Sequence, residues 1–144
     1  MSIFQPLSIS SSALTAQRLK LDTISSNIAN ANTTRGQFVN GQWQPYQRKT
    51  VEIGTKQPAP FSQYLQQQLT GVQVNGIVAD QSPARPVYDP TNPDSNAQGY
   101  VMMPNVDVTK EMVDLTATSR DYEANVTAFN AGKAMLLKAL EIGK

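Results

Sequence analysis

The sequence predicts a mainly α-helical protein with a small β-rich insertion, in which long N- and C-terminal helices form an antiparallel coiled-coil pair. A heptad pattern of apolar residues runs without a break through the last quarter of the chain, and a narrower pattern of the same period runs near its start. Helical periodicity is lost between them, where most prolines and glycines occur. We therefore expect an N-terminal helix in residues 1–34, a β-rich or irregular outer module in 35–104 and a C-terminal helix in 105–144.

The C-terminal helix is the longest predicted element, from Asp107 to Ile142. It would extend about 54 Å at 1.5 Å per residue, too far for a chain of this size to cover, so it must lie along another helix. Pro104 precedes it, Asn105 or Asp107 can cap its first amides, and Gly143 follows it. Its predicted packing face, here called the seam, consists of Val108, Met112, Leu115, Ser119, Tyr122, Val126, Phe129, Lys133, Leu136 and Leu140.

The face of this helix opposite the seam is unusual because it carries small side chains where a coiled coil exposes charge. Two interpretations remain open: the alanines let the backbone of a second helix approach closely, or they are there as the best helix formers. Together with the seam, they favour a helix that is contacted on two sides. We call Ala117, Ala124 and Ala131 the alanine strip and expect it to contact a neighbouring subunit.

The N-terminal helix is predicted from Ser8 to Asn30, with Pro6 tolerated before or within its first turn. Its apolar residues recur at steps of seven, and those expected to pack against the seam are Leu14, Leu21 and Ile28. Asn27 and Asn30 share a face near its end. They either terminate the helix or form a ladder of carboxamides that bonds to neighbouring chains, in which case they are interface residues.

The middle of the chain contains three predicted strands, at Thr50–Ile53, Val72–Val78 and Gly99–Met103, with alternating or β-branched residues. Phe61–Leu69 is predicted to form one or two helical turns. The stretch that contains Pro83, Pro86, Pro90 and Pro93 is predicted to be a stiff, extended excursion.

Composition argues against an enzyme, a metal site, a cofactor, nucleic-acid binding and membrane insertion. The formal net charge is +1, and both cysteine and histidine are absent. No apolar run approaches the roughly 20 residues that span a bilayer, and residues 1–17 lack the basic start of a secretory signal. Residues 92–96 resemble the start of a calcium loop, but Ala97 and Met103 replace its glycine and closing glutamate, so we expect a proline-bound turn.

Five short motifs are informative in combination: residues 12–18 (SALTAQR), 25–33 (SSNIANANT), 76–80 (GIVAD), 99–107 (GYVMMPNVD) with 111–112 (EM), and 120–125 (RDYEAN). The second and fourth resemble the terminal signatures of bacterial flagellar axial proteins, a family of rod, hook and hook-associated subunits. The others resemble the short proximal-rod member of that family. The resemblance covers both ends and much of the middle, and is weakest at 56–70.

The resemblance implies a structural subunit that is exported by the flagellar type III apparatus and polymerises into a helical tube. It implies copies of the chain, other rod proteins, membrane-ring or rod adaptor proteins and the export apparatus as partners. The expected location is the basal body, in the periplasmic space. The tube would transmit torque for motility and leave a channel for later subunits.

The main alternative is a discrete homo-oligomeric coiled coil that presents a β cap to a cell-wall ligand, such as a glycan. Trp43, Tyr46 and Tyr88 are candidate aromatic contacts for such a ligand, although core or turn packing is the expected use of these side chains.

Overall fold

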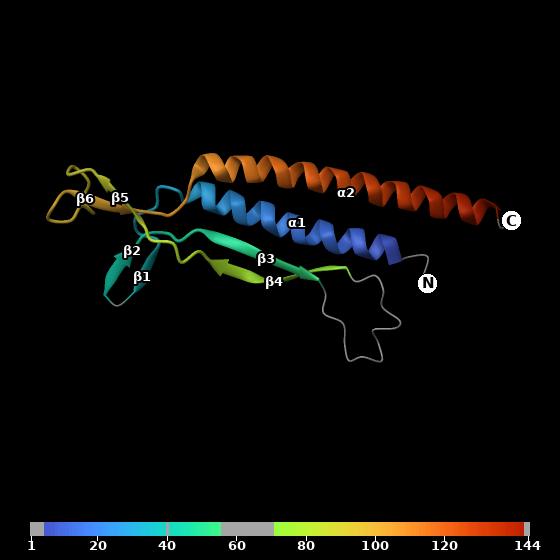
Figure 1. Cartoon of the computed structure of the whole chain (residues 1–144), viewed down its shortest axis with the longest axis horizontal. Coiled ribbons are helices and arrows are strands. Elements are labelled where there is room, and N and C mark those ends of the chain that lie inside the picture. Colours follow the sequence, from blue (N-terminus) through green and yellow to red (C-terminus); the bar gives the residue numbers. More distant parts are fainter. Residues whose placement is uncertain (1–4, 40, 56–70, 143–144) are drawn as a thin grey trace. The chain divides into compact units, whose positions relative to one another are not determined.

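The computed structural model describes residues 5–39, 41–55 and 71–142 (Figure 1). In chain order the elements are α1 (Gln5–Ala29), β1 (Gln37–Val39), β2 (Gln42–Gln44), β3 (Lys49–Thr55), β4 (Val72–Ala79), β5 (Arg85–Tyr88), β6 (Tyr100–Met103) and α2 (Val108–Ile142). The structure thus has a helix near each end and a small β-rich middle, as the sequence predicts. No helix in the described part of the chain is long and apolar enough to cross a membrane.

Both predicted helices are confirmed, with small differences at their ends. The N-terminal helix α1 begins three residues earlier than expected, so Pro6 lies in its first turn, where a missing N–H costs nothing. The C-terminal helix α2 begins directly after Asp107, whose Oδ1 accepts hydrogen bonds from the backbone N–H groups of Thr109 (2.9 Å) and Lys110 (3.3 Å). Asp107 is therefore the N-cap, and Asn105 is not.

The strands form three two-stranded sheets, β1–β2, β3–β4 and β5–β6. Predicted strands at β3, β4 and β6 are confirmed. The β1–β2 hairpin was not expected, although Asn-Gly at 40–41 in the sequence is typical of hairpins and Gly41 has a φ of 82°. Strand β5 lies in the predicted extended proline stretch and was not itself predicted; it pairs antiparallel with β6 and tolerates Pro86 at a sheet edge. The predicted helical turns at 61–69 lie outside the described residues.

Contacts divide the chain into two compact units. Unit 1 comprises Met1–Leu21, Val51–Gly76 and Thr116–Lys144, and unit 2 comprises Asp22–Thr50 and Ile77–Leu115. Each unit therefore contains parts of both helices and of the β-rich middle. The expected division into 1–34, 35–104 and 105–144 follows chain order instead, and it stays a prediction.

The buried positions of both units are small or polar to an unusual degree. The buried apolar residues are Ala16, Ile24, Ala31, Val101 and Val106, and the buried polar ones are Thr23, Asn27, Glu111 and Thr118. No large apolar core is formed among the described residues. Hydrogen bonds and ion pairs must therefore supply much of the specificity of this fold.

The face that α2 buries within the chain is not centred on the predicted seam. Its most buried side chains are Glu111 and Thr118, at 0% and 1% exposure. Asn125 and Gly132 continue this line at steps of seven and are half-buried. Four seam residues of the same helix are exposed: Val108, Met112, Lys133 and Leu140. The other six are half-buried. The chain thus buries a polar and small line and leaves part of the apolar stripe uncovered.

Candidate functional site

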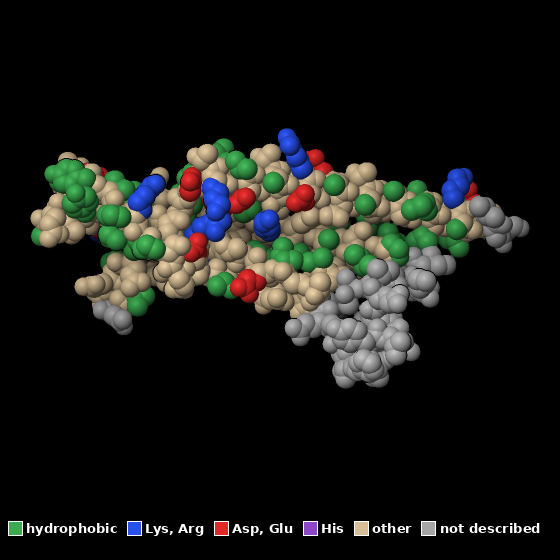
Figure 2. All heavy atoms as spheres, viewed as in Figure 1, with side chains coloured by type: hydrophobic (Ala, Val, Ile, Leu, Met, Phe, Trp, Pro, Cys, Tyr) green, Lys and Arg blue, Asp and Glu red, His purple; other side chains and the backbone are tan. Residues whose placement is uncertain are grey.

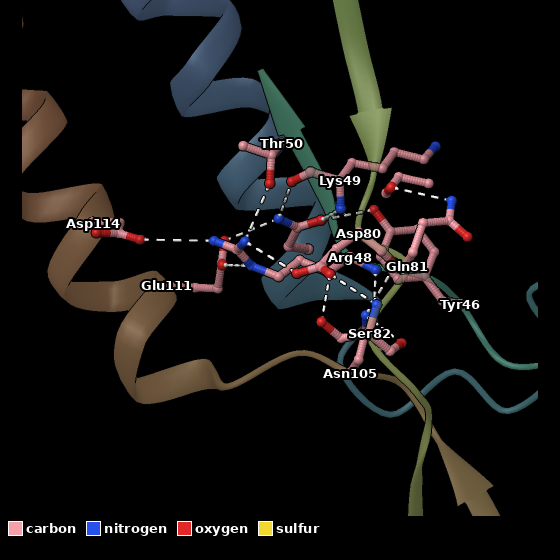
Figure 3. Close-up of polar contacts among 12 residues, drawn as sticks. Tyr46, Arg48, Lys49, Thr50, Asp80, Gln81, Ser82, Asn105, Glu111 and Asp114 are labelled. Atoms are coloured by element: carbon pink, nitrogen blue, oxygen red, sulfur yellow. Dashed lines mark hydrogen bonds and ion pairs between the residues drawn. The ribbon is translucent and has the colours of Figure 1, made fainter. Parts of the chain in front are cut away.

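A buried polar network in unit 2 joins the last turns of α1, the start of β3 and the first turn of α2 (Figure 3). Its central side chains are Asn27, Arg48 and Glu111, which are far apart in the sequence. The helices bring them together because Asn27 lies in the last turn of α1 and Glu111 lies in the first turn of α2. We call these three residues, with Tyr46, Lys49, Asp80, Asn105 and Asp114, the joint network.

Asn27 satisfies its whole hydrogen-bonding capacity inside unit 2. Its Nδ2 donates to the backbone carbonyl of Lys49 (2.8 Å) and to Oε2 of Glu111 (3.0 Å). Its Oδ1 accepts from the backbone N–H of Lys49 (2.9 Å) and from the hydroxyl of Tyr46 (3.0 Å). The carboxamide thus pairs with Lys49 as a neighbouring peptide group would in a sheet, which fixes the end of α1 to β3.

Glu111 is held as a buried carboxylate by Arg48. Arg48 Nε donates to Glu111 Oε1 at 2.6 Å, and the Arg48 side chain is 19% exposed. Burial opposes the charged form of Arg48, but the hydrogen bond and the charge of Glu111 prevail and raise the pKa of Arg48 above its usual value. Asp80 and Asp114 lie farther from the guanidinium, at 3.6 and 3.9 Å. One arginine therefore orders three carboxylates from two segments of unit 2.

Asn105 adds backbone contacts to the joint network. Its Oδ1 accepts from the N–H of Arg48 (2.8 Å), and its Nδ2 donates to the carbonyls of Asp80 (3.2 Å) and Ser82 (3.1 Å). The Ser82 hydroxyl and N–H in turn donate to Asp80, which lowers the pKa of that carboxyl. Asn105 was a candidate cap in the sequence, but it instead fixes the chain that leads into α2.

A second polar cluster in unit 2 is formed by Arg35 and Asp94. The Nε and Nη2 atoms of Arg35 both donate to Oδ1 of Asp94, and the Thr34 hydroxyl donates to its Oδ2 at 2.7 Å. The hydrogen bonds from Arg35 have the largest effect on the pKa of Asp94, and together with that from Thr34 they lower it. The loop around Asp94 is otherwise held by short-range Asx bonds, such as Asp94 N–H to Asn92 Oδ1 (3.0 Å). This is the expected turn, and the described residues contain no group that could hold a metal ion.

The Arg35–Asp94 pair predicts a specific loss of stability in acid. Because the pKa of folded Asp94 lies below its ordinary value of 3.8, its contribution is complete above that value and disappears as the pH falls through the folded pKa. We expect wild type to resist urea better than Asp94→Asn at neutral pH, and this advantage to disappear as the pH falls below 3.8 and through the lowered pKa of Asp94. Asp121→Asn on α2 is the control, and an Asp94→Asn difference that persists unchanged in acid would contradict the prediction.

The predicted interface residues fall into two groups in the single chain. Ala117, Ala124 and Ala131 are exposed, so the alanine strip is available to a partner. Asn27 is 1% exposed with all its polar atoms engaged, and Asn30 is half-buried, donating to the Ser26 carbonyl at 2.9 Å. The bonds of Asn27 make it a member of the joint network in this conformation. Its contact with neighbouring chains, like the packing role of the seam, stays a prediction.

The sequence patterns did not identify Arg48 or Glu111 as functional side chains, and they indicated Tyr46 only as a candidate aromatic contact. Arg48 and Glu111 are 63 positions apart and belong to no spacing that a local pattern detects. The position of Glu111 in the first turn of a helix is one signal, because a negative charge there interacts favourably with the helix dipole. This signal, however, indicates an exposed carboxylate. Burial of Glu111 comes entirely from the tertiary fold.

In unit 1 the C-terminal part of α2 carries large apolar side chains that the chain leaves open to solvent. Met135, Leu137 and Leu140 are 68%, 53% and 70% exposed. Large apolar side chains exposed on two sides of one helix are suited to contacts with other molecules. The alanine strip lies on the same helix, so α2 offers more than one face for assembly.

Comparison with known proteins is consistent with this arrangement of terminal helices. Residues 7–36 match the family described as Flagella basal body rod protein, and residues 97–142 match that described as Flagellar basal body rod FlgEFG protein C-terminal. The flagellar basal-body rod protein FlgC of Bacillus subtilis (strain 168) is 54% identical over 100% of both chains. FlgC of Salmonella typhimurium is 40% identical over 100% of both chains, and FlgC of Borreliella burgdorferi is 39% identical over 99% of this chain and 98% of its own.

Proposed function

We propose that this chain, which belongs to the family of flagellar basal-body rod proteins and is a structural subunit of the rod, polymerises through its terminal helices into a hollow shaft. The shaft would form the proximal rod, transmit torque and let exported subunits pass. The chain is a structural protein rather than an enzyme, and it associates with copies of itself and with other rod proteins. Membrane-ring or rod adaptors and the type III export apparatus are further proposed partners, and the periplasmic space is the proposed location.

The observation that carries this proposal is the exposure of α2 along faces that the chain itself leaves uncovered. A helix of 35 residues with exposed Met135, Leu137 and Leu140 and an exposed alanine strip is suited to contacts with neighbouring helices. Close-packed long helices make a stiff wall because van der Waals contact continues along their whole length. Stiffness is the property that a torque-bearing shaft requires.

Antiparallel pairing of the terminal helices is part of the proposal. Two contacts in unit 1 support it: Asn125 Nδ2 donates to Gln17 Oε1 at 3.1 Å, and a Cβ on Gly132 would lie 3.5 Å from Leu7 Cδ2. As the position rises on α2 it falls on α1, which is the order expected for antiparallel helices. At this distance a Cβ on residue 132 would be in ordinary van der Waals contact with Leu7, so the two helices lie close together at this level.

Cysteine cross-linking tests the shaft, since the chain has no cysteine of its own. We propose to express Ala131→Cys in a Bacillus subtilis strain that lacks its own rod protein and to treat isolated basal bodies with a short bifunctional maleimide. We expect covalent dimers and larger species, because the alanine strip would face a neighbouring subunit.

The matched control is Asn130→Cys, which is also exposed but lies about 100° around the helix from Ala131. It should give far less cross-linked product. Basal bodies that contain the Ala131→Cys chain but yield no cross-linked species, or yield as much from Asn130→Cys, would overturn the proposed interface.

A further inference from the structure

We propose that a hollow in unit 2 binds a neutral pyranose ring of a glycan chain, with Trp43 as the stacking surface. The hollow has a volume of about 210 Å³ and lies between β2, β6 and the loop that carries Asp94. We call it the aromatic pocket and define it by Thr34, Arg35, Trp43, Asp94, Asn96 and Tyr100. This inference concerns the β-rich part of unit 2 and does not depend on assembly of the rod.

Trp43 is exposed to a degree that core packing does not explain. Its side chain is 56% exposed, and the neighbouring Phe38 is 61% exposed. The two rings lie 5.1 Å apart at 58°, so Phe38 supports the Trp43 ring in a fixed position on the β1–β2 hairpin. Trp43 and Tyr88 are both exposed, so neither is part of a core, and each packs against a single aromatic neighbour. A rigid, exposed indole is suited to stacking on a flat, weakly polar ring.

Tyr100 extends the aromatic surface of the pocket along β6. Tyr88 on the paired strand β5 holds it edge-to-face at 5.4 Å and 67°. Gly99 allows this arrangement, since it has a φ of 81° and a Cβ there would lie 2.9 Å from Cε2 of Tyr88. Figure 2 shows hydrophobic side chains gathered at the end of unit 2 that carries β5 and β6, and exposed Met102 belongs to this surface.

The polar lining of the pocket indicates a neutral ligand with many hydroxyl groups. Arg35 is paired with Asp94, so the charges of the two side chains cancel. Two of the five N–H groups of Arg35 bond to Asp94, and the Arg35 side chain remains 55% exposed. The low pKa of Asp94 keeps it a hydrogen-bond acceptor at neutral pH. Sugar hydroxyls both donate and accept, and therefore match a donor and an acceptor held side by side.

A pyranose ring also fits the aromatic part of the pocket. Its C–H groups form an apolar face with a slight positive charge, which complements the negative face of an aromatic ring. An apolar protein segment would cover the N–H groups of Arg35 that do not bond to Asp94 and would offer them no acceptor, at a cost in free energy. An anionic or cationic ligand would have to compete with the existing ion pair. The mixture of aromatic and balanced polar groups thus favours a neutral sugar.

The experiment uses the full-length monomer and chitotetraose as the probe. Trp43 is the only tryptophan in the chain, so its fluorescence reports directly on the pocket. We expect a saturable change in fluorescence and saturation transfer to the sugar protons in NMR. By calorimetry, Trp43→Ala should weaken binding about tenfold or more, because tryptophan contacts of this kind dominate binding. Arg35→Lys should weaken it several-fold, because lysine lacks the planar donor fork.

Ile77→Ala is the control variant, since Ile77 is 49% exposed in unit 2 but lies outside the pocket. It should bind chitotetraose as wild type does. Far-UV circular dichroism confirms that each variant is folded. The proposal is overturned if wild type shows no saturable fluorescence change and no saturation transfer, or if folded Trp43→Ala binds the sugar as tightly as wild type.

Discussion

Replacing Arg48 by methionine is expected to lower the free energy of unfolding by about 3–5 kcal/mol. The variant would leave the carboxylate of Glu111, which is fully buried, without its guanidinium partner at 2.6 Å. An unpaired buried charge is far costlier than a lost surface ion pair. Urea unfolding should be followed by far-UV circular dichroism and by the fluorescence of Trp43, which lies in the same unit.

The double variant Arg48→Met/Glu111→Gln distinguishes an unpaired charge from lost packing. Removing both charges should restore most of the stability, because no buried charge is left unpaired and the glutamine carbonyl can still accept the hydrogen bond from Asn27 Nδ2. Arg85→Met is the control, since Arg85 is exposed in the same unit, and it should change stability by less than about 0.5 kcal/mol. If Arg48→Met were as mild as Arg85→Met, the joint network would not stabilise unit 2 as argued.

The existence and extent of the helices could be predicted from the sequence because heptad spacing and end signals are local. The face that each helix buries could not. A heptad pattern identifies the apolar stripe, whereas the single chain buries the adjacent line through Glu111, Thr118 and Asn125. The apolar stripe and the buried line differ because side chains that remain exposed in one chain can be covered by another. Periodicity alone does not say which chain covers them.

The joint network shows why the candidate site was harder to predict than the fold. Asn27 and Glu111 are 84 positions apart, and each looks like an ordinary end-of-helix residue in its own segment. Both lie in motifs on which the resemblance to flagellar axial proteins was based, at 25–33 and 111–112. The structure gives these motifs a common physical role, because a hydrogen bond of 3.0 Å joins them inside unit 2.

The β-rich part was predicted unevenly for equally physical reasons. β3 and β4 contain β-branched residues and were found. The prolines around β5 predict an extended chain, but whether such a chain pairs with another strand depends on the tertiary fold, and an edge position tolerates proline. Trp43 was considered as a ligand contact, but its exposure depends on how the hairpin lies over neighbouring residues. That arrangement has no signature in the local sequence.

Replacing Ala124 by tryptophan is expected to abolish rod assembly while leaving the single chain folded. Ala124 is exposed, so the larger side chain meets only solvent in the monomer. In a shaft where the alanine strip faces a neighbouring helix, it would separate the two backbones. Overpacking of this kind costs about 1–3 kcal/mol per contact and is repeated at each subunit. Motility in soft agar and electron cryotomography of basal bodies measure the effect, in a strain that depends on this chain.

Asn130→Trp is the matched control, because it introduces the same bulk at an exposed position of α2 that lies outside the alanine strip. It should preserve much more motility than Ala124→Trp. Both variants should keep the far-UV circular dichroism spectrum of the wild-type monomer, so that a loss of assembly reflects the interface and not the fold. Normal rods and swimming with Ala124→Trp would show that no helix packs closely against this strip, and the shaft would then have to be built from other faces of α2.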